Sequence, residues 1–372
     1  FISGPSSSDA SSATSPVPSD GLTVEVWGRD LGPPLRRWSF SALTADHDGS
    51  TIRTAQRPED ATGRGDTAAD DEGGEPPLDA ATATLPITGA AAADPPNGSP
   101  DPWVDLGAGT AFGSLVHEVL EEADLQAPDL EGEFARVIAA GSPPDELDQP
   151  RLAVAVAAST LTPMGGSLGS LTLAGLPRAD QLRELDFDLP LEGASRPTGA
   201  DLTRLVDHWL PPDDPLAGRT FALGTAATLP LAGMLTGSID LTIRARGSAG
   251  EPDRYVVADY KTNLLAPWGT VDPEAAHPDR LVDAMVAHDY PLQALLYEVA
   301  LHRHLRWRLP GYDPDVHLGG AACLFLRGMA VPDTATTADG RTYGVFTWQP
   351  PTGLILALSN LLAGATLEEV TQ

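Results

Sequence analysis

Apolar residues recur at helical spacing in several stretches after residue 105. In Thr110–Glu121 the apolar positions 112, 115, 116, 119 and 120 fall on one face of an α-helix. A second pattern, Asp201–Leu210, stops at Pro211 and Pro212, which mark the end of a helix because proline cannot continue one. Further helices are predicted over residues 134–140, 151–161, 289–307 and 353–362.

Other stretches have the period of a β-strand. Within Leu182–Leu191 apolar side chains at 185, 187 and 189 alternate with acidic ones at 184, 186 and 188, which predicts a strand with one polar face. Met234–Arg244 and Arg254–Lys261 flank a polar turn with two glycines, which predicts a β-hairpin. Strands are also predicted at 319–326 and 343–348, and 170–173 is a further short apolar run. Together these elements predict an α/β fold with a mixed central sheet flanked by helices.

The first hundred residues have a different composition. Residues 1–20 are rich in Ser, Pro, Ala and Asp, and 44–102 are dominated by Asp, Gly, Ala, Pro and Thr. Such segments cannot bury enough apolar surface to fold. We therefore expect residues 1–104 to be a largely disordered tether and 105–372 to form the folded domain. A short ordered segment is predicted near 22–44, with a strand at 22–26 and a short helix capped by Ser39 or Ser41.

The charge of the chain bears on its partners. The formal net charge is −29 and the pI is about 4.4, which argues against a free-standing nucleic-acid binder, because affinity for phosphate comes from clustered Lys and Arg. The densest positive stretch is Leu301–Arg308, which contains His302 and His304. It is interpreted as a solvated basic face, and contact with phosphate is the sharper alternative.

Several classes of protein are disfavoured by what the sequence lacks. The single cysteine, Cys323, cannot build a disulfide framework, a four-cysteine zinc site or an iron–sulfur cluster, and its apolar surroundings suggest a small buried side chain. No G-x-x-x-x-G-K-[ST] loop is present, so no ATP site is expected. No stretch approaches about 20 apolar residues, and the start at Phe1 is unlike a signal peptide. We expect a cytoplasmic location, no membrane contact, and a piece of a longer chain.

Lys261 is the only lysine among the 23 basic residues. A strand ending in Asp259-Tyr260-Lys261 places the carboxylate and the ammonium on one face, because alternate side chains of a strand point the same way. Asp240 lies on the partner strand of the predicted hairpin. Two converging carboxylates suit Mg²⁺, which prefers oxygen ligands, and an adjacent lysine can assist the attacking water and stabilise charge on a phosphoryl oxygen. The alternative is a salt bridge between strand ends.

The same residues belong to a pattern of motifs in a fixed order. Gly237–Asp240 followed by Val256–Asn263 resembles the core of the PD-(D/E)XK nucleases, in the RecB-type form. Gly109–Glu121 is similar to that family's upstream helix, Tyr290–Tyr297 to its downstream Q-x-x-x-Y helix, and Gly319–Gly328 to a characteristic strand. The resemblance covers residue 105 to the end, and Arg37–Leu43 looks like the segment that joins a helicase part to the nuclease.

The resemblance implies a restriction-endonuclease-like fold and a set of site residues. It implies His117, Asp240, Asp259 and the Tyr260 backbone carbonyl as ligands of one Mg²⁺ ion, and Lys261 as the catalytic lysine. Gln293 and Tyr297 would arrange the site or contact DNA. Glu184 matches the family's acidic residue on the preceding strand, although Asp186 lies on the same face and could take its place.

The activity that the resemblance implies is that of a Mg²⁺-dependent exodeoxyribonuclease. Its substrate is DNA, its setting is double-strand-break repair and recombination, and its partners are RecC- and RecD-like subunits. Two alternatives stay open, a catalytically silent module for docking and regulation, and a nuclease domain of a related two-subunit helicase–nuclease. His117 could also be a structural histidine, and Gln293 and Tyr297 could cap a polar edge of a core helix.

Overall fold

The structure is a computed structural model that describes residues 36–44, 101–141, 143–191, 196–219, 221, 223, 227–248, 250–270, 272–329 and 336–372. Most of the predicted tether, including the strand expected at 22–26, lies outside these residues. The elements of the described part, in chain order, are β1 (Arg37–Trp38), α1 (Phe40–Thr44), α2 (Thr110–Glu122), α3 (Leu130–Ala140), α4 (Gln149–Thr160), β2 (Gln181–Leu191), α5 (Gly199–Trp209), β3 (Gly233–Ala245), β4 (Arg254–Lys261), α6 (Pro278–Ala287), α7 (Tyr290–Arg308), α8 (Pro314–His317), β5 (Leu318–Phe325), α9 (Leu326–Met329), β6 (Val345–Trp348), α10 (Thr352–Leu362) and α11 (Leu367–Val370).

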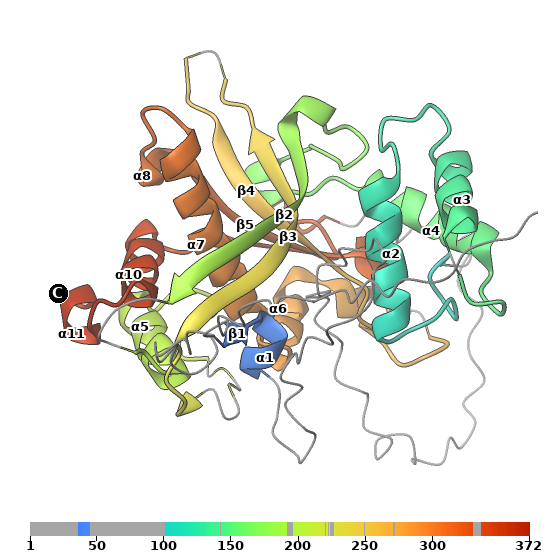
Figure 1. Cartoon of the computed structure of the whole chain (residues 1–372). Coiled ribbons are helices and arrows are strands. Elements are labelled where there is room, and N and C mark those ends of the chain that lie inside the picture. The colour runs from blue at the N-terminus through green and yellow to red at the C-terminus, as the bar shows by residue number, and fades with distance from the viewer. Residues whose placement is uncertain are drawn as a thin grey trace, which may run out of the picture. The chain divides into compact units, whose positions relative to one another are not determined.

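Six strands of the described part form one mixed sheet, shown in Figure 1. The order is β1-β3-β4-β5-β6, and β2 also pairs with β3. β1 runs parallel to β3 and β4 runs parallel to β5, whereas the β2–β3, β3–β4 and β5–β6 pairs are antiparallel. The hairpin predicted from the sequence is therefore confirmed, and it lies at the centre of the sheet.

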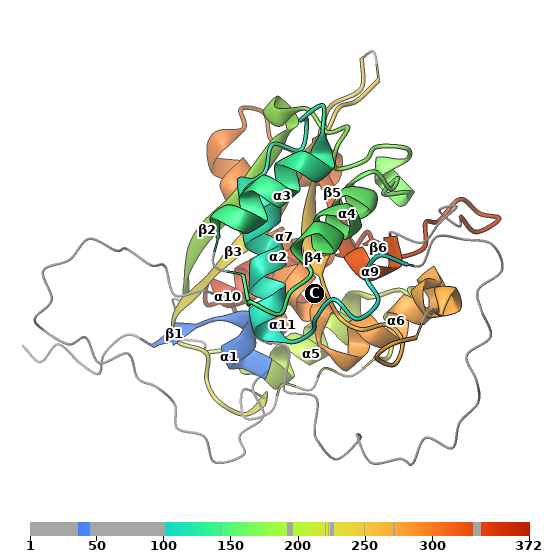
Figure 2. The ribbon, with the colours of Figure 1, turned by 90° about the vertical axis from the view of Figure 1, so that its right-hand side faces the viewer.

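Helices cover both faces of the sheet, and each face has its own hydrophobic core. On one face α2, α3 and α4 pack on side chains such as Val256, Ala258 and Tyr260 of β4; Figure 2 shows these three helices together on the near side of the sheet. The opposite face buries Val257 of β4 beneath α7, α10 and α5. Because successive residues of a strand point to opposite faces, Asp259 and Lys261 lie on the α7 side of the sheet.

The long strand β3 changes partner along its length. β4 pairs with its last five residues, from Ala245 opposite Arg254 to Leu241 opposite Ala258. β1 pairs with Met234 and Leu235 near its start. Asp240 lies just where β4 and β3 diverge. We call this opening between the two strands the fork.

The short segment before the acidic stretch packs with the sheet. Trp38 and Phe40 are buried in the α7-side core, and the Trp38 indole donates to the carbonyl of Ala232. Ser39 accepts a hydrogen bond from the amide of Ala42, so of the two serines predicted to cap this helix, Ser39 does so.

The hydrophobic pattern predicted most of the longer elements, but not the short helices α8, α9 and α11. The short apolar run at 170–173 lies outside the sheet and packs Leu173 into the α2-side core. α6 was not predicted from the sequence. His302 is not part of a solvated face, because it is buried and its Nδ1 lies 2.9 Å from the Tyr312 hydroxyl. No helix in the described ranges is long and apolar enough to cross a membrane.

Candidate active site at the fork between β3 and β4

Asp240 replaces the missing backbone pairing at the fork. Its Oδ2 accepts a hydrogen bond of 2.8 Å from the amide of Tyr260, a group that the β3–β4 ladder no longer serves. Buried backbone amides need a partner, so the carboxylate both closes the fork and is fixed by it. Asp240 is buried, with 8 % of its surface exposed. Its hydrogen bond to Tyr260 places it beside the end of β4.

Lys261 is held between a carboxylate and an amide. Its Nζ lies 2.6 Å from Oδ2 of Asp259 and donates to Oε1 of Gln293 over 2.8 Å. The ammonium also lies 3.8 Å from the centre of the Tyr290 ring, a favourable cation–π distance. Burial opposes the charge, but the nearby Asp259 carboxylate outweighs it with help from Tyr290, so the pKa of Lys261 is raised. Lys261 is thus a fixed, buried ammonium ion.

α7 supplies the second layer of contacts. Gln293 and Tyr297 are one helical turn apart and face the sheet. The Gln293 Nε2 donates to the Tyr297 hydroxyl over 2.9 Å, while its Oε1 accepts from Lys261. The Tyr297 ring meets the edge of Phe187 on β2. A chain of polar contacts therefore runs from Tyr297 through Gln293 to Lys261. The predicted helical spacing of Gln293 and Tyr297 is confirmed.

His117 reaches the fork from the opposite face of the sheet. Its Nε2 lies 3.0 Å from the Tyr260 carbonyl and its Nδ1 lies 3.5 Å from Oδ2 of Asp240. The helix can approach closely because Gly113 has no side chain; a Cβ there would stand 3.3 Å from Thr262 Oγ1. α2 and α7 therefore meet at the fork from the two faces of the sheet.

Glu184 lies beside this group and Asp186 does not. Arg183 pairs with Leu241 and Leu185 pairs with Ile239, so the register places Glu184 opposite Asp240. Its Oε2 accepts a 2.7 Å hydrogen bond from Ser238. The backbone of Glu184 has φ of 46°, an uncommon conformation outside glycine. Asp186 is exposed, so the geometry favours Glu184 of the two acidic residues.

The charges of the fork do not balance among its own side chains. Burial, together with the negative charge of Asp259, raises the pKa of Asp240 to about 7, although His117 and Lys261 act in the other direction. The fork holds two buried carboxylates beside one lysine, which favours an added cation. Among the described residues, no three His, Cys, Asp or Glu side chains are grouped to hold a metal as they stand. Mg²⁺ does not need such a cage, because one or two carboxylates and several waters suffice.

Some contributors to the site were not singled out from the sequence. Tyr290 lies under the Lys261 ammonium, and its hydroxyl donates to Oδ1 of Asn263 over 3.0 Å. Ser238 orients Glu184. Both lie inside stretches that the sequence marked as motifs, and Ser238 precedes Asp240 by two residues on β3.

The fold and the fork define an α/β domain that buries a carboxylate–lysine cluster at the end of its central hairpin. No protein-family model matches the chain. The chain is 40% identical over 367 residues to the RecBCD enzyme subunit RecB of Mycolicibacterium smegmatis, which covers 94% of this chain and 31% of that protein. It is 40% identical over 373 residues to RecB of Mycobacterium tuberculosis (strain CDC 1551 / Oshkosh), covering 96% and 31%.

A more distant match is RecB of Escherichia coli (strain K12), which is 31% identical over 262 residues, 70% of this chain and 20% of that protein. The chain therefore spans about a third of the length of its mycobacterial relatives. Over its own length, the chain is homologous to the RecB subunit of the RecBCD enzyme.

Proposed function

We propose that this chain is a metal-dependent DNA nuclease of the PD-(D/E)XK type, which hydrolyses phosphodiester bonds at the fork. The observation that carries the proposal is the contact of Lys261 with both Asp259 and Gln293, beside the buried Asp240. A structural salt bridge would need only one carboxylate and one lysine. The second buried carboxylate and the polar chain from α7 are what a site for a phosphate-bound cation needs.

In this proposal the oxygens of Asp240 and Asp259 hold one Mg²⁺ ion, with His117 and the Tyr260 carbonyl completing the donor set. The ion would polarise the scissile phosphate and lower the pKa of a bound water. Lys261 contacts two oxygen acceptors in the fork, so it acts as a donor. Its ammonium is placed to stabilise the negative charge that develops on a phosphoryl oxygen.

Gln293 and Tyr297 keep that ammonium in position. The Gln293 amide is oriented by the Tyr297 hydroxyl, and its oxygen accepts from Lys261. A lysine side chain has several rotatable bonds, and fixing it in advance removes an entropic cost from the reaction. Glu184 adds negative charge next to Asp240 and would orient a water of the ion.

The relatives are named as subunits of a RecBCD enzyme, and we propose that the chain acts in such an assembly. Its partners would be RecC- and RecD-like subunits, and its role would lie in the repair and recombination of broken DNA. A net charge of −29 disfavours binding of DNA by this chain alone. A strand delivered by a helicase in the same assembly resolves that difficulty.

The test is Mg²⁺-dependent degradation of single-stranded DNA by the complete assembly that contains the full-length protein. Asp240→Asn should lower the initial rate by at least a hundredfold, because it removes a carboxylate from the ion. Glu184→Gln should lower it about tenfold. Asp186→Asn, on the same strand but exposed, is the matched control and should cut at the normal rate.

Equal rates for Asp240→Asn and the unmutated assembly would make the chain a docking or regulatory module with a nuclease-like fold. The alternative of a two-subunit helicase–nuclease keeps the cutting and changes the partners. Purification of the native assembly and identification of its subunits by mass spectrometry separates these two cases.

A further inference from the structure

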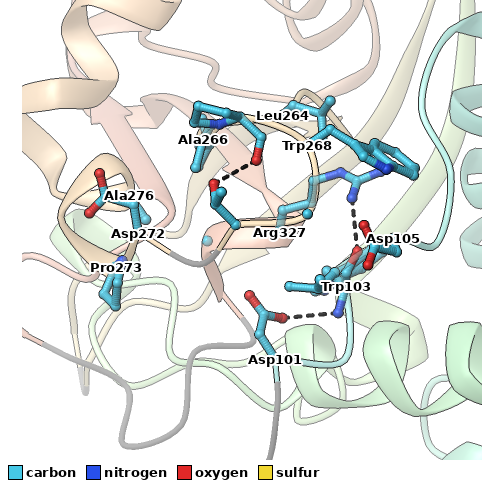
Figure 3. A pocket seen from close by; sticks show the side chains of 16 residues that line it. Asp101, Trp103, Asp105, Leu264, Ala266, Trp268, Asp272, Pro273, Ala276 and Arg327 are labelled. Carbon is cyan, nitrogen blue, oxygen red and sulfur yellow. Dashed lines mark hydrogen bonds between the residues drawn. The ribbon is translucent and has the colours of Figure 1, made fainter. Parts of the chain in front are cut away.

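A hollow lies beyond the end of β4, next to the fork. We call it the Trp268 hollow; it is lined by residues of the segments 101–105, 264–270 and 272–276 and by two residues after β5. The lining includes Asp101, Trp103, Asp105, Trp268, Asp272 and Arg327. It contains about 510 Å³ of empty space, counting its open mouth. Figure 3 shows Trp268 and Asp105 on one side of it and Asp272 and Pro273 on the other.

Arg327 lines the hollow and is hydrogen-bonded to the residue that follows Lys261. Its Nε donates to the Thr262 carbonyl over 2.6 Å, and its two other nitrogens donate to the carbonyls of Trp103 and Gly107. The residue is 8 % exposed. Thr262 directly follows Lys261, and the lining begins at Leu264, so at most roughly 10 Å of extended chain separates the hollow from the lysine.

The hollow combines an exposed aromatic ring with carboxylates. Trp268 is 53 % exposed, and indole rings stack on nucleobases whatever their sequence. Oδ1 of Asp105 lies 3.4 Å from where a Cβ would stand on the neighbouring Gly269. Asp105 also has φ of 58°, a conformation that aspartate and asparagine tolerate better than most residues. The aromatic ring and an acceptor therefore stand together at the rim.

The charge of the lining decides which part of a DNA strand can enter. Asp101, Asp105 and Asp272 would repel a phosphate, and the donors of Arg327 are directed at backbone carbonyls. A carboxylate accepts hydrogen bonds from exocyclic amino groups, as in the pairing of acidic side chains with cytosine N4. Cytosine, adenine and guanine carry such a group. Thymine does not, and it presents carbonyl oxygens instead.

We propose that the Trp268 hollow is a nucleobase subsite that holds a base of the strand being cut, one or two nucleotides from the scissile phosphate. The base stacks on Trp268 and donates its amino group to Asp105, so amino-bearing bases are preferred over thymine. Arg327 is a positioning residue that fixes the hollow relative to Lys261. This subsite rests on the proposed nuclease function, and it adds a sequence preference that the fork by itself does not supply.

The first test reads the preference directly. The complete assembly digests a single-stranded DNA of random sequence, and the product ends are sequenced. The unmutated enzyme should show thymine depleted about fivefold or more at one position near the cut. Trp268→Ala should flatten that position and lower kcat/KM by between about fivefold and a hundredfold, whereas Trp268→Phe should retain most of both. Leu161→Ala, an apolar residue that is 58 % exposed and does not belong to this lining, is the matched control.

Asp105→Asn sharpens the test, because asparagine tolerates the backbone of Asp105 and offers both a donor and an acceptor. It should admit thymine and so reduce the depletion of thymine at that position. Cutting with no base preference in the unmutated enzyme, or a preference that Trp268→Ala leaves intact, overturns the subsite while the nuclease function stands.

A second readout does not depend on cutting. In EDTA, a single strand carrying 5-iodocytosine is irradiated with the assembly, and crosslinked peptides are mapped by mass spectrometry. Crosslinks should fall within 264–270 and disappear in Trp268→Ala. If Mg²⁺ supports no cutting but these crosslinks form, the nuclease function fails and the base subsite stands. Crosslinks elsewhere only, with no Trp268 dependence, overturn the subsite.

Discussion

Lys261 and Arg327 are two buried cations near the ends of the neighbouring parallel strands β4 and β5, and they are held in opposite ways. Lys261 contacts a carboxylate and a side-chain amide. Arg327 donates only to backbone carbonyls in the contacts described above, from three separate nitrogens. Each is 8 % exposed, so burial alone does not distinguish them.

The difference lies in whether the partners of each cation can move. Side-chain partners such as Asp259 can turn toward an ion or a substrate while the backbone stays in place. Backbone carbonyls cannot turn away without a change in the backbone itself, so Arg327 holds Thr262 and the segment 103–107 together. A compact ammonium suits the first task and a planar fork of donors suits the second. Under the proposed function, Lys261 would serve the reaction and Arg327 the architecture of the site.

Substitution of Lys261 should produce the largest effect on the rate of cutting. Lys261→Ala should reduce Mg²⁺-dependent cutting by roughly a hundred- to a thousandfold, the usual cost of removing a donor that stabilises developing charge. Lys261→Arg keeps the charge but should lose most of the cutting, because the guanidinium is too large for the space between Asp259, Gln293 and Tyr290. Initial rates on single-stranded DNA measure both. Near-normal cutting by Lys261→Arg would contradict the assigned role.

Substitution of Arg327 should mainly lower the stability of the fold. Arg327→Met leaves three carbonyls without their donor and should lower the free energy of unfolding by about 3 kcal/mol. Arg327→Lys should recover only part of this, since an ammonium cannot span three divergent carbonyls. Chemical denaturation of the assembly, with hydrogen exchange of residues 103–107 as the local probe, checks this. Unchanged exchange in Arg327→Met would refute the architectural role.

Glu298 shows what burial costs a charge that has no such partner. It is 1 % exposed, its Oε1 has no hydrogen-bond partner among the described residues, and burial raises its pKa to about 8. The folded state binds the proton more tightly than the unfolded state, so stability falls as pH rises from about 4.5 towards 8.

Glu298→Gln should remove that loss. We expect it to exceed the unmutated protein by about 2 kcal/mol at pH 8 and to match it near pH 4.5, since one pKa unit corresponds to about 1.4 kcal/mol and local relaxation relieves part of the cost. Thermal melts across this pH range provide the measurement. A stability difference that is independent of pH would show that Glu298 does not titrate in this way.

Tyr297→Phe should have the smallest effect. It removes the hydroxyl that accepts from Gln293 and leaves the ring against Phe187. A loss of about 1 kcal/mol corresponds to a five- to tenfold fall in kcat, with little change in KM if the residue acts only through Gln293 and Lys261. The kcat and KM of the variant are the measurement, and a change confined to KM would instead favour direct contact with DNA.

Much of the fold could be predicted because the hydrophobic pattern of each element agrees with its final place. β5 is apolar throughout and is buried on both faces, as expected of a central strand in a sheet covered on both sides. The short apolar run at 170–173 forms no strand among the described residues and instead packs Leu173 into the α2-side core. A short apolar run alone does not distinguish a strand from a turn that contributes to a core.

The candidate site was predictable as a set of residues and not as an arrangement. The order of the motifs identified Asp240, Asp259, Lys261, Gln293 and Tyr297, and the structure brings them together. The choice of Glu184 over Asp186 needed the β2–β3 register. The hydrophobic pattern likewise gave no sign that His302 would be buried against Tyr312.

The sequence by itself determined the strand that carries Asp259 and Lys261 on one face, because alternation is a property of the local backbone. It also determined the helical spacing of Gln293 and Tyr297. Only the tertiary structure decided that α2 and α7 meet at a fork in the sheet, and that Arg327 joins this fork to the Trp268 hollow. Those contacts link residues up to 224 positions apart, a separation over which packing decides and local preference carries no information.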